Sequence, residues 1–219
     1  MIRKSILMLV AAAAVVASSG AATAQDLDGP YLGLNFGYGW GAPEVLLNGA
    51  AITPGNLEAH GFELGVVGGY NIHQSGVLYG VEVDLGVPDQ SATYQSNPGG
   101  AGNQTATSDL LYLASARARL GADLDGFVPF VSAGLTAGEN QTTLAVGGTS
   151  VSDRSLQVGY TLGGGIEMPV SEQISFKLEY LFTDIGNDNS MSVTGPGGSS
   201  ALGAGHKIHA IRVGANFHF

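Results

Sequence analysis

Eight segments of the chain alternate apolar residues with small or polar residues at every second position. This period places successive side chains on opposite faces of a β-strand. The segments are residues 31–40, 62–71, 77–86, 112–121, 127–136, 156–167, 174–183 and 211–219. No segment sustains a helical period of 3.6 residues. The sequence therefore predicts an all-β fold built on eight strands.

The connections between these segments alternate strictly between short and long. Three are short, at residues 73–76, 123–126 and 169–172, and four are long, at residues 42–58, 88–108, 139–153 and 184–205. Tight turns at one end and long loops at the other are typical of an up-and-down barrel that crosses an outer membrane. A soluble sandwich with Greek-key crossovers gives no reason for this pattern. We therefore expect an eight-stranded antiparallel up-and-down transmembrane β-barrel.

The N-terminal segment has the features of an export signal. Two basic residues precede an apolar run at residues 6–17, and small residues at 22–24 match a signal-peptidase site. The apolar run is too short to cross a bilayer, which takes about 20 residues. The sequence therefore predicts a cleaved signal peptide at residues 1–24 and an outer-membrane barrel domain at residues 25–219.

The composition excludes several classes of function. The net charge is −10, so we expect no nucleic-acid partner, because affinity for phosphate depends on clustered basic residues. The absence of cysteine excludes a disulfide scaffold, a thiolate metal site and a catalytic thiol. The five histidines lack metalloprotease spacing, and no G-x-S-x-G motif occurs. We expect no enzymatic activity, no metal and no cofactor.

Charged residues gather on the polar faces of the predicted strands. The set comprises Glu63, Glu82, Asp84, Arg117, Arg119, Glu167, Lys177, Glu179 and Arg212. A basic residue on the lipid face costs about 2–4 kcal/mol at the bilayer midplane, so these side chains should point into the lumen. Eight strands enclose a lumen that side chains can fill, which predicts a plug of ion pairs. The alternative is a narrow, cation-preferring diffusion channel, which the many inward glycines would favour by leaving water-filled voids.

Aromatic residues gather near both ends of the apolar faces. Near the long loops lie Tyr38, Trp40, Phe62, Tyr112 and Phe182, and near the opposite end lie Tyr70, Tyr79, Phe127, Phe176, Phe217 and Phe219. Two aromatic girdles around an apolar band are typical of membrane barrels. Arg154 and Lys207 lie at the outer rim, where we expect them to contact the phosphates of lipopolysaccharide.

Three segments, at residues 159–167, 177–184 and 209–219, resemble the small outer-membrane β-barrel family of Gram-negative bacteria. The resemblance is to OmpA-like eight-stranded barrels of the alphaproteobacterial type. Phe217 and Phe219 form a terminal aromatic-x-Phe pattern that resembles the signal read by the barrel-assembly machinery. Because no peptidoglycan-binding domain follows the barrel, we expect no tether to the cell wall.

The resemblance implies a location in the cell outer membrane, among its lipids and lipopolysaccharide. It also implies a structural role in envelope integrity and at the cell surface, and we expect a monomer. Two other roles stay open at this point. One is the narrow diffusion channel, and the other is binding of haemin or a host surface by the loops, which rests on the resemblance alone.

Overall fold

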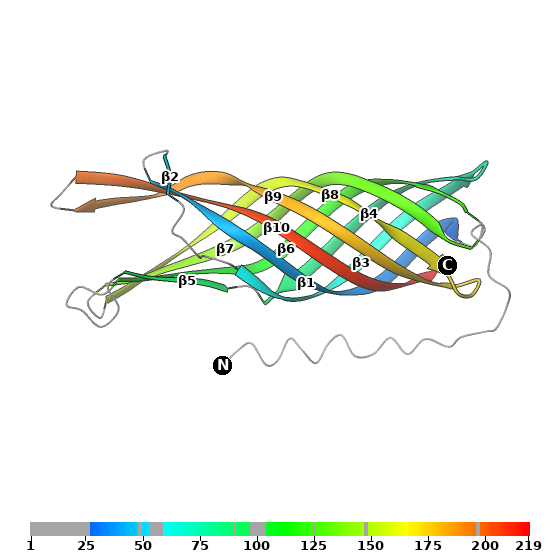
Figure 1. Cartoon of the computed structure of the whole chain (residues 1–219), viewed down its shortest axis with the longest axis horizontal. Coiled ribbons are helices and arrows are strands. Elements are labelled where there is room, and N and C mark those ends of the chain that lie inside the picture. The colour runs from blue at the N-terminus through cyan, green and yellow to red at the C-terminus, as the bar shows by residue number, and fades with distance from the viewer. Residues whose placement is uncertain are drawn as a thin grey trace.

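The computed structural model describes residues 27–47, 50–52, 59–89, 91–96, 104–124, 126–146, 149–195 and 198–219. The predicted signal peptide at residues 1–24 lies outside these ranges. The described part of the chain forms β1 (Gly29–Leu47), β2 (Ala50–Ile52), β3 (Ala59–Gln74), β4 (Val77–Pro88), β5 (Ser91–Ser96), β6 (Gln104–Ala122), β7 (Val128–Val146), β8 (Thr149–Pro169), β9 (Ile174–Gly195) and β10 (Gly198–His218) (Figure 1). Among the same residues, no helix has the length and apolar character needed to span a bilayer.

Eight of these strands close into a barrel. Consecutive strands pair antiparallel in the order β1, β3, β4, β6, β7, β8, β9 and β10. The wall closes where β10 pairs with β1, in a register that runs from Tyr31 opposite His218 to Leu47 opposite Leu202. Each of the eight segments with a period of two falls on one of these strands, apart from the terminal residues Phe127 and Phe219, so the predicted fold class is confirmed.

Tight turns join the strands at one end of the barrel, as the short connections predict. Ser75 and Gly76 both have left-handed φ angles, +53° and +79°, which a two-residue hairpin turn of type I′ requires. Gly126 has a φ of +106° between β6 and β7. Between β8 and β9, the N–H of Val170 donates to the carbonyl of Ile174 at 2.8 Å. The C-terminus lies at this end (Figure 1).

The connections at the other end are mostly paired strand, which corrects the prediction of four long loops. β7 and β8 stay paired up to Val146 and Thr149, and β9 and β10 stay paired up to Gly195 and Gly198. The short strands β2 and β5 pair with β1 and β6. Threonine and valine in these segments favour strands once a hairpin register continues. Two strand extensions therefore project from this end of the barrel, one formed by β9 and β10 and the other by β5, β6, β7 and β8 (Figure 1). We call them the ribbons.

The alternation sorts side chains between the outer wall and the lumen. On β4, Val81 and Val83 are 61% and 62% exposed, whereas Glu82 and Asp84 are 3% and 2% exposed. The outer wall is thus apolar and the lumen is polar, in the arrangement that a hydrocarbon environment selects.

Candidate functional site: the lumen and the outer rim

The structure places all nine charged residues of the predicted lumen set inside the barrel and joins them in one network. Each of the nine is at most 4% exposed. They come from β3, β4, β6, β8, β9 and β10, so the network is held by strands on opposite sides of the lumen. Four are basic and five are acidic, and ion pairs join each of them to a residue of opposite sign. Each charge therefore has an oppositely charged neighbour to offset the cost of its burial.

Arg117 on β6 lies at the centre of this network. Its guanidinium pairs with Glu82 of the adjacent strand β4 and lies 3.1 Å from Asp84 Oδ2. On its other side the guanidinium lies 3.2 Å from Glu179 Oε1 of β9, across the lumen. Lys177 Nζ of β9 donates to Glu82 Oε2 at 2.7 Å. Ion pairs therefore cross the lumen from wall to wall.

Arg212 and Arg119 extend the network toward the two ends of the barrel. Arg212 pairs with Glu63 through two of its nitrogens and donates to Asp84 Oδ1 at 3.2 Å. Arg119 Nη2 donates to Glu167 Oε2 at 2.6 Å. The forked geometry of a guanidinium holds two acceptors at once, which stabilises such junctions.

Glu167 accepts hydrogen bonds from three different side chains. Besides its bond from Arg119, its Oε1 accepts from Ser175 Oγ at 2.5 Å and from Asn216 Nδ2 at 2.7 Å. His218 Nε2 lies 3.8 Å from the same oxygen. Glu167 has no solvent exposure. Removal of any one donor would therefore leave a buried charge with a poorer set of partners.

Sequence reasoning missed two aromatic residues that complete the network. Tyr31 donates from Oη to Glu82 Oε2 at 2.7 Å. The ring of Phe130 lies 4.3 Å from Arg119 Cζ, in cation–π contact. Tyr31 lies on the inward face of its strand, so its parity was a usable signal. Phe130 has inward parity too, but an apolar ring on a polar face gives no reason to expect a contact with Arg119.

Glycines on the lumen face provide the space that these long side chains fill. A Cβ atom on Gly37 would lie 2.8 Å from both Arg212 Cγ and Glu63 Oε1, so the pair meets across this position. A Cβ on Gly80 would lie 2.8 Å from Arg119 Cγ. The expectation that inward glycines leave water-filled voids is wrong at these positions, because side chains of neighbouring strands occupy the space.

Two apolar layers flank the charged network along the barrel axis. Toward the ribbons, Leu110, Leu113, Ile185 and Ile208 form a cluster in which each residue is at most 7% exposed. Toward the tight turns, Leu27, Leu78 and Val128 form a second cluster in which each is at most 1% exposed. The sequence did not predict either layer. Together they place apolar side chains above and below the ion pairs.

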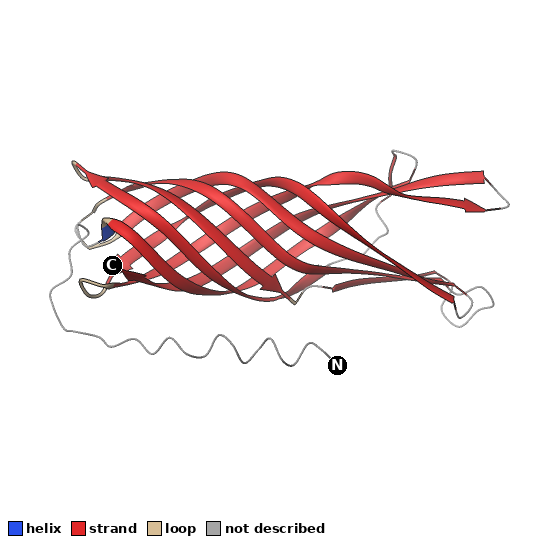
Figure 2. Ribbon diagram, turned by 180° about the vertical axis from the view of Figure 1, so that it is seen from behind, coloured by secondary structure: helices blue, strands red, loops and turns tan. Residues whose placement is uncertain are grey.

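Leu27 belongs to the apolar layer near the tight turns, and it comes from the segment that precedes β1. Its carbonyl accepts from Asn71 Nδ2 at 3.1 Å, and the following residue Asp28 accepts through Oδ1 from the N–H of His73 at 2.9 Å. Leu27 itself has helical backbone geometry, and Figure 2 shows this short helical turn beside the C-terminus, at the end of the barrel with the tight turns. The turn therefore inserts Leu27 into that mouth.

Replacing Leu27 with alanine should lower the free energy of unfolding by about 2 kcal/mol, because it removes a buried side chain from the cluster with Leu78 and Val128. Guanidinium unfolding of the refolded barrel, followed through the fluorescence of the only tryptophan, measures this change. Leu124→Ala is the matched control, since Leu124 lies near the same end and is 49% exposed. Equal effects of the two substitutions would contradict a packing role for Leu27.

The two predicted rim residues face outward on different strands. Arg154 of β8 is 65% exposed and its Nη1 lies 3.7 Å from Glu139 Oε1. Lys207 of β10 is exposed and lies opposite Asp184 of β9 in the register. Their contact with lipopolysaccharide stays a prediction.

The two terminal aromatic residues lie at the mouth with the tight turns. The rings of Phe217 and Phe219 meet edge to face with centroids 5.2 Å apart, and Phe219 is 73% exposed. The N–H of Phe219 donates to the carbonyl of Pro30 at 3.1 Å. The terminal ring is thus displayed on the surface, and its recognition by the assembly machinery stays a prediction.

The structure describes only part of the loops that the sequence analysis considered for ligand binding. Loop positions that would bind haemin or a host surface include residues 53–58 and 97–103, which lie outside the described ranges. Among the residues that are described, no group of three or more His, Cys, Asp or Glu could hold a metal ion.

Comparisons with known proteins agree with the architecture. Residues 9–219 match the family described as outer membrane protein beta-barrel domain. The 25 kDa outer-membrane immunogenic protein of Brucella abortus is 30% identical over 162 residues, which cover 74% of this chain and 67% of that protein. The 31 kDa outer-membrane immunogenic protein of Brucella melitensis is 29% identical over 230 residues, covering 96% and 93%. The outer membrane protein OprG of Pseudomonas aeruginosa has a similar fold, with a TM-score of 0.50, 14% identity and coverage of 88% and 96%.

Proposed function

The chain belongs to the outer-membrane β-barrel protein family, and we propose that it acts there as a closed structural barrel that contributes to envelope integrity and does not conduct ions. The observation that carries this proposal is the content of the lumen. A wall-to-wall network of nine buried charges lies between two buried apolar layers.

This arrangement opposes a diffusion path for two physical reasons. A passing ion would have to separate buried ion pairs, and an unpaired buried charge is strongly destabilising. The same ion would also have to pass the buried apolar clusters near both ends, whose side chains cannot replace its hydration shell. The network and the layers act in series, so the loss of one would leave the other in place.

Planar-bilayer recording of the refolded protein tests the proposal. We expect no steady single-channel conductance above the background of a protein-free bilayer. The faster gel migration of the folded, unheated barrel confirms that the same sample is folded. Steady, voltage-independent conductance from that sample would overturn the proposal in favour of the narrow channel.

A cellular measurement tests the structural role separately. A strain that lacks the protein should be more sensitive to detergents, and expression of the wild-type chain should restore resistance. Leu124→Ala serves as a control because it changes an exposed side chain and leaves the lumen intact; it should complement fully. Unchanged sensitivity of the deletion strain would contradict a role in envelope integrity.

A further inference from the structure

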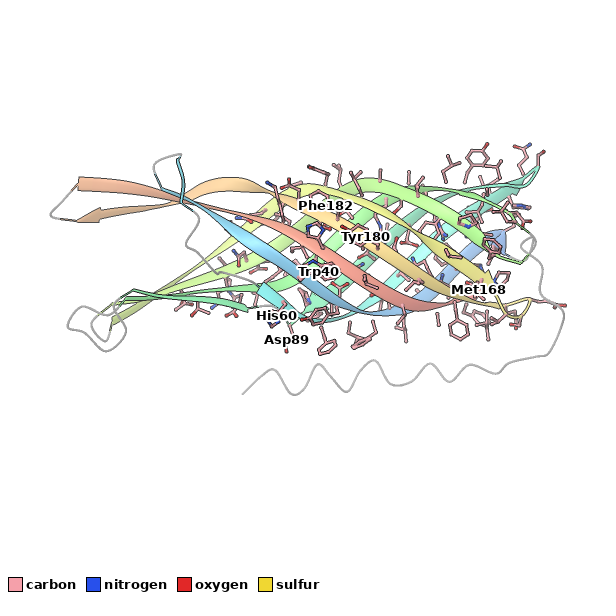
Figure 3. All side chains as sticks on the ribbon, viewed as in Figure 1. Trp40, His60, Asp89, Met168, Tyr180 and Phe182 are labelled. Atoms are coloured by element: carbon pink, nitrogen blue, oxygen red, sulfur yellow. The ribbon has the colours of Figure 1, made fainter. Side chains whose placement is uncertain are left out.

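The outer wall carries a cluster of rings near the ribbon end that the closed lumen does not use. We define the headgroup patch as Trp40 of β1, Tyr180 and Phe182 of β9, and His209 and Lys207 of β10. Figure 3 shows the labelled members Trp40, Tyr180 and Phe182 on the same face of the barrel. In the register, His209 lies between Trp40 and Phe182, which makes it the centre of the patch.

His209 is held by rings on both sides. Its imidazole stacks on Trp40 with centroids 5.9 Å apart and planes 17° from parallel, and its centroid lies 5.2 Å from that of Phe182. Tyr180 Oη lies 2.6 Å from His209 Nδ1. When the phenol donates this bond, the ring proton of a neutral imidazole is on Nε2. His209 is then a positioned N–H donor on the lipid-facing side of the wall.

Lys207 adds a positive charge on the same face. It is the next outward position on β10 after His209, and two residues along a strand lie about 6.6 Å apart. Asp184 lies opposite Lys207 in the register and accepts from Tyr160 Oη at 3.3 Å. The carboxylate of Asp184 would therefore repel an anionic ligand at Lys207, and the attraction of the basic side chain must exceed this repulsion.

The surroundings of the patch match an amphiphile rather than a small soluble anion. On β10, toward the middle of the wall, the outward residues after His209 are Ile211 and Val213, which are 49% and 53% exposed. The polar groups of the patch thus lie at the end of an apolar track. Tryptophan, tyrosine and histidine with an apolar body and a polar tip suit the headgroup depth of a membrane.

We propose that the headgroup patch binds the phosphate of a phosphorylated glycolipid of the outer leaflet, such as lipid A. Lys207 and His209 hold the phosphate, and Trp40 and Phe182 contact the adjoining part of the lipid. The inference rests on the location of this family in the outer membrane and not on the closed lumen. The conductance result and the binding result can therefore fail independently.

Of the two rim cations, Lys207 is the one that this geometry selects. Arg154 of β8 lies 3.7 Å from the carboxylate of Glu139, and it is not on the strands that carry the stacked rings of Trp40 and His209. Arg154 and Lys207 therefore form a matched pair of exposed basic residues, one outside the patch and one within it.

The fluorescence of Trp40 reports binding directly, because it is the only tryptophan in the chain and stacks on His209. The refolded protein in detergent micelles is titrated with diphosphorylated lipid A, with dephosphorylated lipid A and with inorganic phosphate. We expect a saturable change with the phosphorylated lipid. The other two probes should produce half-maximal change only at concentrations at least about tenfold higher, because each lacks either the charge or the apolar anchor.

Single substitutions then locate the site. Lys207→Ala and His209→Phe should each raise the midpoint for phosphorylated lipid A about tenfold, since each removes one charge-assisted or oriented hydrogen bond. His209→Phe keeps an aromatic ring beside Trp40, and gel migration confirms that each variant folds. Tyr79→Phe, which changes an exposed ring at the tight-turn end of the wall, should stay within about twofold of the wild type.

Four results would overturn the assignment. They are the absence of a saturable response, an equal response to dephosphorylated lipid A, an equal response to inorganic phosphate, and equal midpoints for the Lys207→Ala, His209→Phe and wild-type proteins.

Discussion

Replacing Arg117 with methionine should lower the free energy of unfolding by about 3–5 kcal/mol, among the largest effects of any single substitution in this chain. The methionine fills similar volume but leaves Glu82, Asp84 and Glu179 without the guanidinium that they share. Lys177 still contacts Glu82 and Glu179, so part of the negative charge stays compensated. Guanidinium unfolding of the barrel in lipid vesicles, followed by Trp40 fluorescence, measures the loss.

Two further variants separate charge from packing in this experiment. Arg154→Met removes an exposed arginine and should change stability by less than about 1 kcal/mol. The double variant Arg117→Met/Glu179→Gln also removes the charge of Glu179, one of the three carboxylates that lose their arginine partner. It should recover part of the lost stability. If Arg117→Met were as stable as Arg154→Met, the network would not contribute to the stability of the barrel.

Replacing Gly134 with alanine should destabilise the barrel by about 3 kcal/mol, although it adds only one methyl group. Gly134 faces the lumen on β7, where a Cβ atom would lie 2.6 Å from the Cα of Arg117 and still closer to the carbonyl oxygen of Ala116. Both are backbone atoms of the paired strand β6, so no side-chain rotation relieves the overlap. The strands must separate locally, which also shifts Arg117 at the centre of the network.

Gly164 of β8 provides the matched control for this substitution. A Cβ atom there would meet only the carbonyl oxygen of Phe130, at 3.5 Å, which is an ordinary contact. Gly164→Ala should therefore leave the unfolding midpoint nearly unchanged, or raise it slightly by restricting the unfolded chain. The fraction of folded barrel on unheated gels and the unfolding midpoint measure both variants. Comparable stability of the two would refute the steric account of Gly134.

The strands and their two faces could be predicted from the sequence because the period of two is a local property. Glu82 and Asp84 alternate with Val81 and Val83, and burial follows that alternation without exception over this stretch. The partners within the lumen could not be predicted in the same way. Arg212 and Glu63 are 149 residues apart, and only the closure of the barrel brings them together across Gly37.

The apolar layers also could not be predicted from the sequence, because they depend on contacts between distant strands. Leu78 and Leu113 have inward parity, and alternation alone treats them as isolated exceptions on polar faces. Their role depends on residues from other strands at the same height, such as Val128 and Ile185. The ribbons were missed for a different reason, since threonine and serine suit both loops and strands, and the choice is made by the register of a hairpin.

The pairing of β1 with β10 has a consequence for biosynthesis. The seam joins the first and last strands of the domain, so it can form only after the whole chain has been made. A product that stops before β10 would leave the facing edges of β1 and β9 without partners, and in hydrocarbon each unsatisfied backbone group costs several kcal/mol. A product without β10 is therefore expected to be much less stable in the membrane than the closed barrel. The pairing of β10 with both of its neighbours makes the last strand a condition for stable insertion.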